Sequence, residues 1–238
     1  MHFHLPKPLH GWREFAGEVG IIVLGVLIAL TAEALVEDIG WRGRVAEARQ
    51  ELRYELGQNV ALLHDRLTEE QCVNHRLDEL ATIVTRASAT GRLPPVGDIG
   101  FPSVYSWPDA VWQSQISAQT ATHFPRRELG TIARVYRDFA DLREENQRER
   151  VTWLTLRTIT GPGRPVTPES IDRLIQAISE ARGYNARFPV WAHVNVRLMN
   201  QGEIGSGFAQ IDPKNPPVLN ANEAICRTLG PAPPTYAG

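Results

Sequence analysis

An uncharged apolar stretch near the N-terminus limits what this chain can fold into more than any other feature. Residues 19–32, VGIIVLGVLIALTA, carry no charge, and a glutamate stands at each end, Glu18 and Glu33. As a helix, the longer segment 15–37 rises about 35 Å, which suffices to cross about 30 Å of bilayer hydrocarbon. We therefore predict a transmembrane helix over residues 15–37 that contacts the lipid bilayer and has Glu18 and Glu33 at its two boundaries.

Three other placements of this stretch compete with a permanent span. The first is a buried core helix, although a helix that packs on one side is rarely apolar around its whole circumference. The second is a cleaved signal peptide, because Ala-Glu-Ala at 32–34 resembles a cleavage box; that leader would be long, and Glu14 and Glu18 interrupt its basic region. The third is a hydrophobic hairpin.

The same region carries a series of short motifs. They are W-R-E-F at Trp12–Phe15, G-E-V-G-I-I at Gly17–Ile22, G-V-x-I-A-L at Gly25–Leu30, and the acidic Glu33. Over Phe3–Glu33 they resemble the N-terminal signature of a family of uncharacterised bacterial single-span membrane proteins. The resemblance implies a short cytoplasmic tail over residues 1–14, a signal-anchor helix in the inner membrane and a larger periplasmic part. It implies no activity.

The distribution of basic residues does not fix the orientation of the span. Lys7 and Arg13 precede it, and Arg42, Arg44, Arg49 and Arg53 follow it. Counting basic residues alone would place the C-terminal side in the cytoplasm, but long domains cross membranes largely regardless of their charge. The periplasmic placement therefore rests on the resemblance.

Amphipathic helical periodicity begins directly after the predicted span. Apolar residues recur every three or four positions, which predicts one long helix over residues 38–88 that can continue from the span. A loop rich in proline and glycine follows at 90–108, and then a short helix at 109–122. A third helix begins near Pro125, and we expect the long first and third helices to pair as an antiparallel hairpin with shorter helices packed alongside.

The second half of the chain is also predicted to be helical. The run REENQRER at 143–150 is polar on all sides, so we expect it to be exposed to solvent. A helix over 167–183 has Thr167 as its cap, Pro168 at its first position and Gly183 at its end.

Residues 188–199 fit a helix or a strand. No second strand is evident as a partner, so we predict a helix. The chain is thus expected to be mainly α, with a helical extracytoplasmic domain over 38–204. Residues 205–238 form a loop and proline-rich tail, with a short helical turn at 222–228.

Whether the two cysteines, Cys72 and Cys226, are free or bridged depends on the compartment of the domain. In a reducing cytosol they would be unrelated thiols, whereas an oxidising periplasm favours one disulfide between them. A bridge would tie the C-terminal tail to the long first helix; the alternative is a free, buried Cys72.

No motif for chemistry emerges from the sequence. We find no catalytic or cofactor-binding motif, and no histidines or cysteines whose spacing would hold a metal ion. A formal net charge of −2 gives no electrostatic case for binding nucleic acid. The chain is therefore not expected to be an enzyme or to carry a cofactor.

The function expected from the sequence is that of a membrane-anchored helical domain with a structural or protein-interaction role. Its expected partners are the lipid bilayer and an unknown protein. A homo-oligomer through the span or the helical hairpin is also permitted, because Ala16 with Gly20 and Gly25 with Ala29 would let two helices approach closely. The alternatives are a sensory input domain that works with a separate output protein, and a membrane-proximal enzyme.

Overall fold

The computed structural model describes residues 11–201 and 223–231, and these residues are mainly helical, as predicted. The chain divides into two compact units, residues 1–48 and 49–238, which we describe separately. The elements in chain order are α1 Trp12–Thr68, α2 Glu70–Thr90, β1 Arg92–Leu93, α3 Ala110–Ser117, η1 Thr120–His123, α4 Arg126–Leu156, η2 Arg157–Ile159, β2 Arg164–Pro165, α5 Pro168–Gln201 and α6 Glu223–Cys226.

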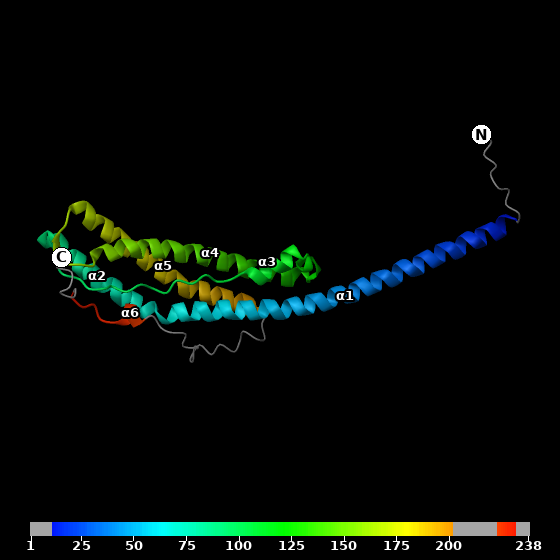
Figure 1. Cartoon of the computed structure of the whole chain (residues 1–238), viewed down its shortest axis with the longest axis horizontal. Coiled ribbons are helices and arrows are strands. Elements are labelled where there is room, and N and C mark those ends of the chain that lie inside the picture. Colours follow the sequence, from blue (N-terminus) through cyan, green and yellow to red (C-terminus); the bar gives the residue numbers. More distant parts are fainter. Residues whose placement is uncertain (1–10, 202–222, 232–238) are drawn as a thin grey trace, which may run out of the picture. The chain divides into compact units, whose positions relative to one another are not determined.

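In the first unit, the predicted membrane segment lies within α1, whose helix continues into the second unit (Figure 1). The prediction of one helix over 38–88 needs a small correction, because Glu69 separates α1 from α2. The hydroxyl of Thr68 donates to the carbonyl of Asp65 at 2.7 Å, and the amide of Glu69 donates to the carbonyl of Arg66 at 3.3 Å. These short-range bonds replace the regular α-helical pattern at this point.

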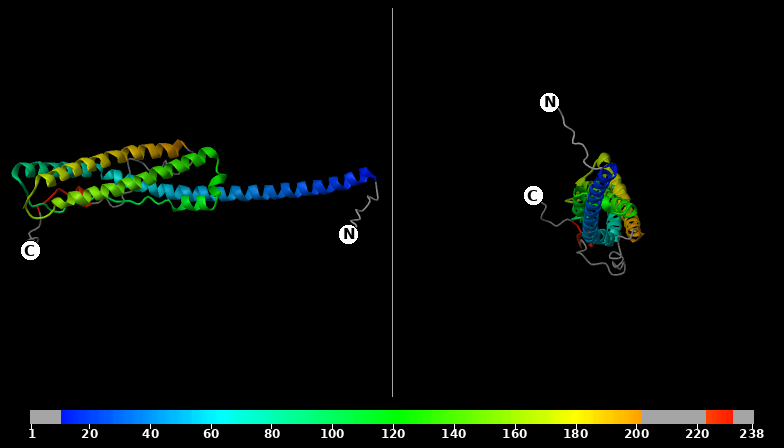
Figure 2. Two further views of the ribbon diagram at one scale, coloured as in Figure 1. Left: turned by 90° about the horizontal axis from the view of Figure 1, so that it is seen from above. Right: turned by 90° about the vertical axis from the view of Figure 1, so that its right-hand side faces the viewer.

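In the second unit, α2, α4 and α5 lie side by side around a shared apolar core (Figures 1 and 2). Each helix contributes apolar residues at spacings of three and four, as amphipathic helices do. From α2 the core residues are Val73, Leu77, Leu80, Val84 and Ala87, and from α5 they are Ile171, Leu174, Ala177, Ile178 and Ala181. Burial of these residues from water holds the helices together.

Two ion pairs give the relative direction of α4 and the part of α1 that belongs to the second unit. Arg49 Nε lies 2.7 Å from Glu128 Oε1, and Arg66 Nη2 lies 2.7 Å from Glu149 Oε1. The residue numbers rise together along both helices, so the two run parallel. The prediction that the first and third long helices form an antiparallel pair is therefore wrong.

The antiparallel helical hairpin is formed instead by α4 and α5. Glu145 on α4 pairs with Arg187 on α5 at 2.8 Å, and Thr152 donates to Glu180 at 3.2 Å. Residue numbers here rise on one helix as they fall on the other. The two-residue strands β1 and β2 pair antiparallel, so the loop that follows α2 is joined to the loop that precedes α5.

The segment that follows α2 explains why α4 runs parallel to α1. Gly91 ends α2 in the left-handed conformation, and the chain then returns along α1 in an extended form. Its contacts occur in reverse order along residues 59–69: Ser103 with Glu69, Tyr105 with Asp65, and the Pro108 carbonyl with Asn59. The segment thus brings the chain back before α3 and α4 begin.

The short helix predicted at 109–122 is two elements, α3 and the 3₁₀ helix η1. Gln119 lies between them with φ of +60°, a conformation that ends an α-helix. Pro125 caps α4, whose first helical residue is Arg126.

The start of α5 agrees with the sequence prediction, but its end does not. Thr167 Oγ1 accepts a hydrogen bond from the amide of Ser170 at 3.3 Å, and Pro168 is the first helical residue. Gly183 does not close the helix, which continues through Pro189 to Gln201. Buried residues on the same face continue past Gly183, namely Asn185, Phe188, Ala192, Asn195 and Met199. Their burial outweighs the low helix propensity of glycine and proline.

The predicted tail at 205–238 lies mostly outside the described residues. Within it, the helical turn expected at 222–228 corresponds to α6.

Two glycines with similar backbone conformations allow a matched test of this packing. Gly91 has φ of +72° and open space where a Cβ would lie; Gly100 has φ of +71°, and a Cβ there would lie 2.8 Å from backbone atoms of Ala224. We expect Gly91→Ala to cost about 1 kcal/mol from the backbone conformation alone. Gly100→Ala should cost about 3 kcal/mol, because backbone atoms cannot move aside as a side chain can. Denaturant unfolding followed by circular dichroism would measure both, and equal losses would contradict the packing at Gly100.

Candidate functional site

The N-terminal part of α1 is the first candidate site. In the described part of the chain, this is the one helix long and apolar enough to cross a membrane, with a mean hydropathy of 2.5 over its most apolar window and none of that window buried. The predicted boundary residues, Glu18 and Glu33, are both exposed on α1. They are separated by fifteen positions, which corresponds to about 22 Å along a helix. Beyond Glu33, the indole Nε1 of Trp41 donates to Glu37 at 3.2 Å.

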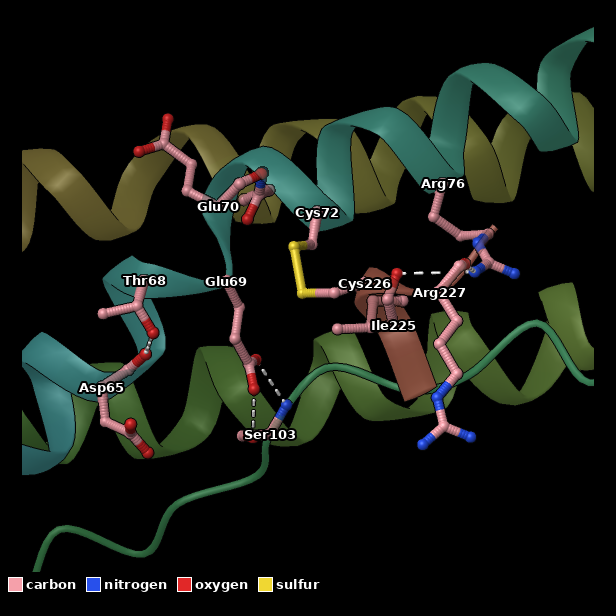
Figure 3. Close-up of a disulfide and its surroundings, with 11 residues drawn as sticks. Asp65, Thr68, Glu69, Glu70, Cys72, Arg76, Ser103, Ile225, Cys226 and Arg227 are labelled. Carbon is pink, nitrogen blue, oxygen red and sulfur yellow. Dashed lines mark hydrogen bonds between the residues drawn. A yellow bond between two sulfur atoms is a disulfide. The ribbon is translucent and has the colours of Figure 1, made fainter. Parts of the chain in front are cut away.

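The two cysteines are the second pair of predicted site residues, and the fold brings them together. The sulfurs of Cys72 on α2 and Cys226 on α6 form a disulfide 2.10 Å long, and it links positions 154 residues apart (Figure 3). Cys226 is exposed and Cys72 is half-buried. The bridge therefore fastens a short C-terminal segment to the bundle.

Arg76 holds the same segment from one turn further along α2. Its side chain is 1 % exposed, and Nη2 donates to the carbonyl of Arg227 and, at 3.5 Å, to that of Ile225 (Figure 3). Burial lowers the pKa of Arg76, while the negative charges of Glu79 and Asp98 act in the opposite direction. Glu79 Oε2 lies 3.1 Å from Arg76 Nε. One nitrogen of this buried guanidinium, Nη2, therefore supplies a donor to the backbone carbonyls of the C-terminal segment.

A cluster of buried polar side chains occupies the bundle interior where α1, α2, α4 and α5 meet. We call Arg66, Asn146, Glu149 and Asn185 the polar cluster; each is at most 1 % exposed. Arg66 Nη2 donates to Glu149 at 2.7 Å and to Asn185 at 3.1 Å, and its guanidinium lies 4.4 Å from the ring centre of Phe188. Burial raises the pKa of Glu149, against the opposite effect of Arg66.

Neighbouring contacts extend this cluster to the returning segment 91–109. The amide of Tyr105 donates to Asn146 at 2.9 Å, and the amide of Ser103 donates to Glu69 at 2.9 Å. The hydroxyl of Tyr105 donates to Asp65, and burial is the main cause of the raised pKa of this tyrosine. The polar cluster therefore specifies where the segment lies as well as how the helices meet.

A second buried carboxylate, Glu55, fixes the start of α3. It accepts hydrogen bonds from the amide of Val111 at 2.9 Å and from the hydroxyl of Tyr136 at 2.7 Å. Burial and the hydrogen bond to Glu55 raise the pKa of Tyr136. The positive end of α3 is thus matched by a negative charge.

Sequence reasoning missed these buried polar residues. The run at 143–150 was expected to be exposed on all sides, but Asn146 and Glu149 are each 1 % exposed. Both continue the buried stripe of α4 between Leu142 and Trp153 at spacings of four, three and four. That spacing indicates that both residues are buried, but a search for apolar residues alone does not detect it because both are polar.

Metal ligands, a pocket and the buried ion pair are the remaining features to consider as a site. Among the described residues, no group of three or more histidine, cysteine or acidic side chains could hold a metal ion. A pocket of about 350 Å³ lies beside the start of α5, with Arg164 and Arg173 among its lining residues. Arg164 is bonded to the backbone carbonyls of Thr158 and Thr160. The Arg66–Glu149 pair is sealed inside the bundle, so its role is structural.

Comparison with known proteins finds no family model, no curated protein and no solved structure that matches this chain. The geometry of the chain itself therefore carries the argument about function.

Replacing Glu149 tests the importance of the polar cluster. Glu149→Gln leaves Arg66 as a buried charge without a counter-charge, so we expect a loss of about 3–5 kcal/mol in unfolding free energy. Glu144→Gln on the same helix is the matched control, because the Glu144–Arg148 pair is exposed, with side chains 65 % and 62 % accessible. The control should change stability by less than about 0.5 kcal/mol.

A double variant separates the charge from the packing. Arg66→Met with Glu149→Leu removes both charges, and we expect it to lose less stability than Glu149→Gln, about 1–3 kcal/mol, because Asn185 Oδ1 still loses the Arg66 donor. Denaturant unfolding measures all three variants. A large loss in the double variant would show that the helices need the ion pair itself.

Removing the disulfide tests its contribution to global stability. The bridge closes a loop of 154 residues, and in the chain-entropy model Cys72→Ser with Cys226→Ser should lower the unfolding free energy by about 4–5 kcal/mol. Denaturant unfolding of both proteins without reductant measures the difference. An unchanged midpoint would show that the bridge does not constrain the unfolded chain as this model requires.

Proposed function

We propose that the protein is a single-pass membrane protein that anchors a disulfide-bonded helical domain at the surface of the bilayer. The observation that carries the proposal is the apolar window of α1, none of which is buried. A core helix of a soluble domain would be covered by protein, whereas this one leaves its apolar side chains exposed, among them Ile21, Ile22 and Ile28 at 74 %, 66 % and 62 %. Lipid hydrocarbon is the environment that such a surface suits.

We also propose that the domain after the span is periplasmic and that the membrane is the bacterial inner membrane. The Cys72–Cys226 disulfide supports this orientation, since such bonds persist in oxidising compartments and are rare in the cytosol. The resemblance of the N-terminal motifs to single-span bacterial proteins agrees with it. The N-terminal tail would then remain in the cytoplasm.

The role proposed for the domain is structural or protein-binding, without catalysis. Two of its buried cations have acidic partners, in the pairs Arg66–Glu149 and Arg76–Glu79, which suits a scaffold. Apolar side chains remain on its surface, including Val151 and Leu154 on α4 at 64 % and 51 % exposure. We propose that the domain presents such surfaces to a protein partner at the membrane.

Carbonate washing of membranes tests the anchor. We expect the full-length chain to stay in the pellet, whereas Leu24→Arg with Leu27→Arg should move it to the supernatant, because each central arginine disfavours insertion by about 3 kcal/mol. Val151→Arg with Leu154→Arg is the matched control, since both residues lie on α4 rather than in the apolar window, and it should stay in the pellet. Release of the wild type, or a mature N-terminus after Ala34, would contradict a permanent anchor.

A fusion tests the orientation. Alkaline phosphatase, which is active only where its disulfides form, should be active when fused after Gly238. A fusion placed after Arg13 and lacking the span is the control and should be inactive. An intact but inactive fusion after Gly238 would place the domain in the cytoplasm.

The binding role requires a partner. Affinity purification of the full chain from detergent-solubilised membranes should enrich the same protein repeatedly, and Val151→Asp with Leu154→Asp should reduce that enrichment at least about tenfold if α4 forms the contact. Enrichment equal to that of an unrelated single-span bait, or a hydrolytic activity lost on one substitution, would contradict the proposal.

A further inference from the structure

The C-terminal segment 224–231, which we call the strap, is bound to the bundle mainly through its own backbone. Arg76 donates to the strap carbonyls of Ile225 and Arg227, and the amide of Gly97 donates to the carbonyl of Gly230 at 2.9 Å. In the other direction, the amide of Leu229 donates to Glu79 at 3.3 Å. Backbone contacts of this kind are how proteins hold a bound peptide.

The strap packs closely against α2 and residues 96–100, and we call this contact surface the groove. A Cβ on Gly97 would lie 2.9 Å from the carbonyl oxygen of Gly230, and a Cβ on Gly100 would lie 2.8 Å from backbone atoms of Ala224. Two glycines therefore let the strap backbone approach. Such contacts depend on the main chain and not on the strap's side chains.

One strap side chain is deeply anchored. Ile225 is 2 % exposed and belongs to the same apolar core as Leu77 and Ile99. Leu229 is partly buried against that core, and the side chains of Ala224, Cys226 and Thr228 are exposed. Backbone hydrogen bonds with a single apolar anchor are the features of a site for a short peptide.

The disulfide is the covalent connection between strap and groove, and its strap end is accessible. Cys226 is exposed on α6, next to the anchor Ile225, and Cys72 is half-buried on α2 (Figure 3). Cys226 is therefore the end of the bridge that a soluble thiol meets first.

We propose that the groove between α2 and residues 96–100 is a peptide-binding site, that the strap is its resident ligand, and that the Cys72–Cys226 disulfide is a redox latch that keeps it bound. A dithiol donor opens the latch by thiol–disulfide exchange. One of its thiolates bonds to Cys226 Sγ and displaces Cys72 Sγ, which takes up a proton. The donor's second thiolate then displaces Cys226 Sγ, which is protonated in turn. The donor leaves as a disulfide, oxidised by two electrons.

Opening of the latch makes the strap a local, reversible ligand of the groove. While the bridge is closed, the amides of the strap and of the helices become open to hydrogen exchange together. Once it is reduced, the strap leaves and rebinds without disturbing the helices, because its contacts are few compared with the α2–α4–α5 core. The proposal rests on contacts within residues 49–231 and does not depend on the membrane placement of the chain.

Hydrogen–deuterium exchange of the full chain in detergent, before and after dithiothreitol, tests the latch. In the reduced protein the amides of Gly97 and Leu229 should exchange at least about tenfold faster than protected amides of α4 and α5, and in the oxidised protein they should not. Cys72→Ser with Cys226→Ser, without reductant, should reproduce the reduced pattern. Equal acceleration of strap and helix amides would mean that the bridge only stabilises the whole fold, which would overturn the latch.

A peptide tests the groove. A fluorescent peptide of residues 223–231, EAICRTLGP, is incubated with full-length wild-type protein in a glutathione redox buffer, and labelling of Cys72 is read by mass spectrometry. The native peptide should label Cys72 at least about tenfold more than the same peptide with Ile225→Asp, since an aspartate cannot occupy the apolar anchor position. Equal labelling would show that only thiol chemistry is measured and would overturn the peptide-binding site.

Discussion

A helix that is apolar around its whole circumference must be covered, because exposing such a surface to water is unfavourable along its entire length. The first part of α1 is of this kind, and none of its most apolar window is buried by protein. Further along the same helix, the pattern changes to a single buried stripe that includes Leu52, Leu56 and Leu63. One continuous helix thus has an N-terminal part that is apolar on all sides and a later part that is apolar on one side. We infer that the environment of the helix changes where this pattern changes.

In the helical domain the corresponding constraint is the pairing of buried charge. Arg66 and Glu149 sit where α1 and α4 meet, and Asn185 adds α5 to the same hydrogen-bonded group. Apolar side chains would fill this space in many registers, whereas a buried ion pair is satisfied in few. Asn185 also donates to the carbonyl of Glu70 and to Asn74 on α2. We infer that the apolar core supplies most of the stability and that the polar cluster selects the arrangement.

Local signals in the sequence were sufficient to predict which segments are helical, but not the directions in which the helices run relative to one another. Thr167 and Pro168 mark the start of α5 as predicted, because capping depends on adjacent residues alone. Gly183 was a wrong stop signal, since burial of Phe188 and Met199 continues the helix and no short window contains that information.

The direction of α4 could not be read from periodicity either, because a stripe is the same in both directions. It follows from the returning segment, whose path is set by contacts such as that of Ser103 with Glu69, 34 positions apart. The cysteines were identifiable as a pair, but their approach depends on the positions of α2 and α6. Asn146 and Glu149 were hidden because polar residues on a buried stripe look like breaks in it.

The position of the two cysteines along the chain imposes an order on folding. Cys72 lies at the start of α2 and Cys226 beyond α5, so the bridge closes a loop that contains nearly all of α2 and the whole of α3, α4 and α5. Closing a loop of this length in an unfolded chain is entropically unfavourable, whereas a folded α2–α4–α5 core already holds the groove in place. The strap is also the last described part of the chain to be synthesised. We therefore expect the disulfide to form in a domain whose helices are already packed, rather than to direct how they pack.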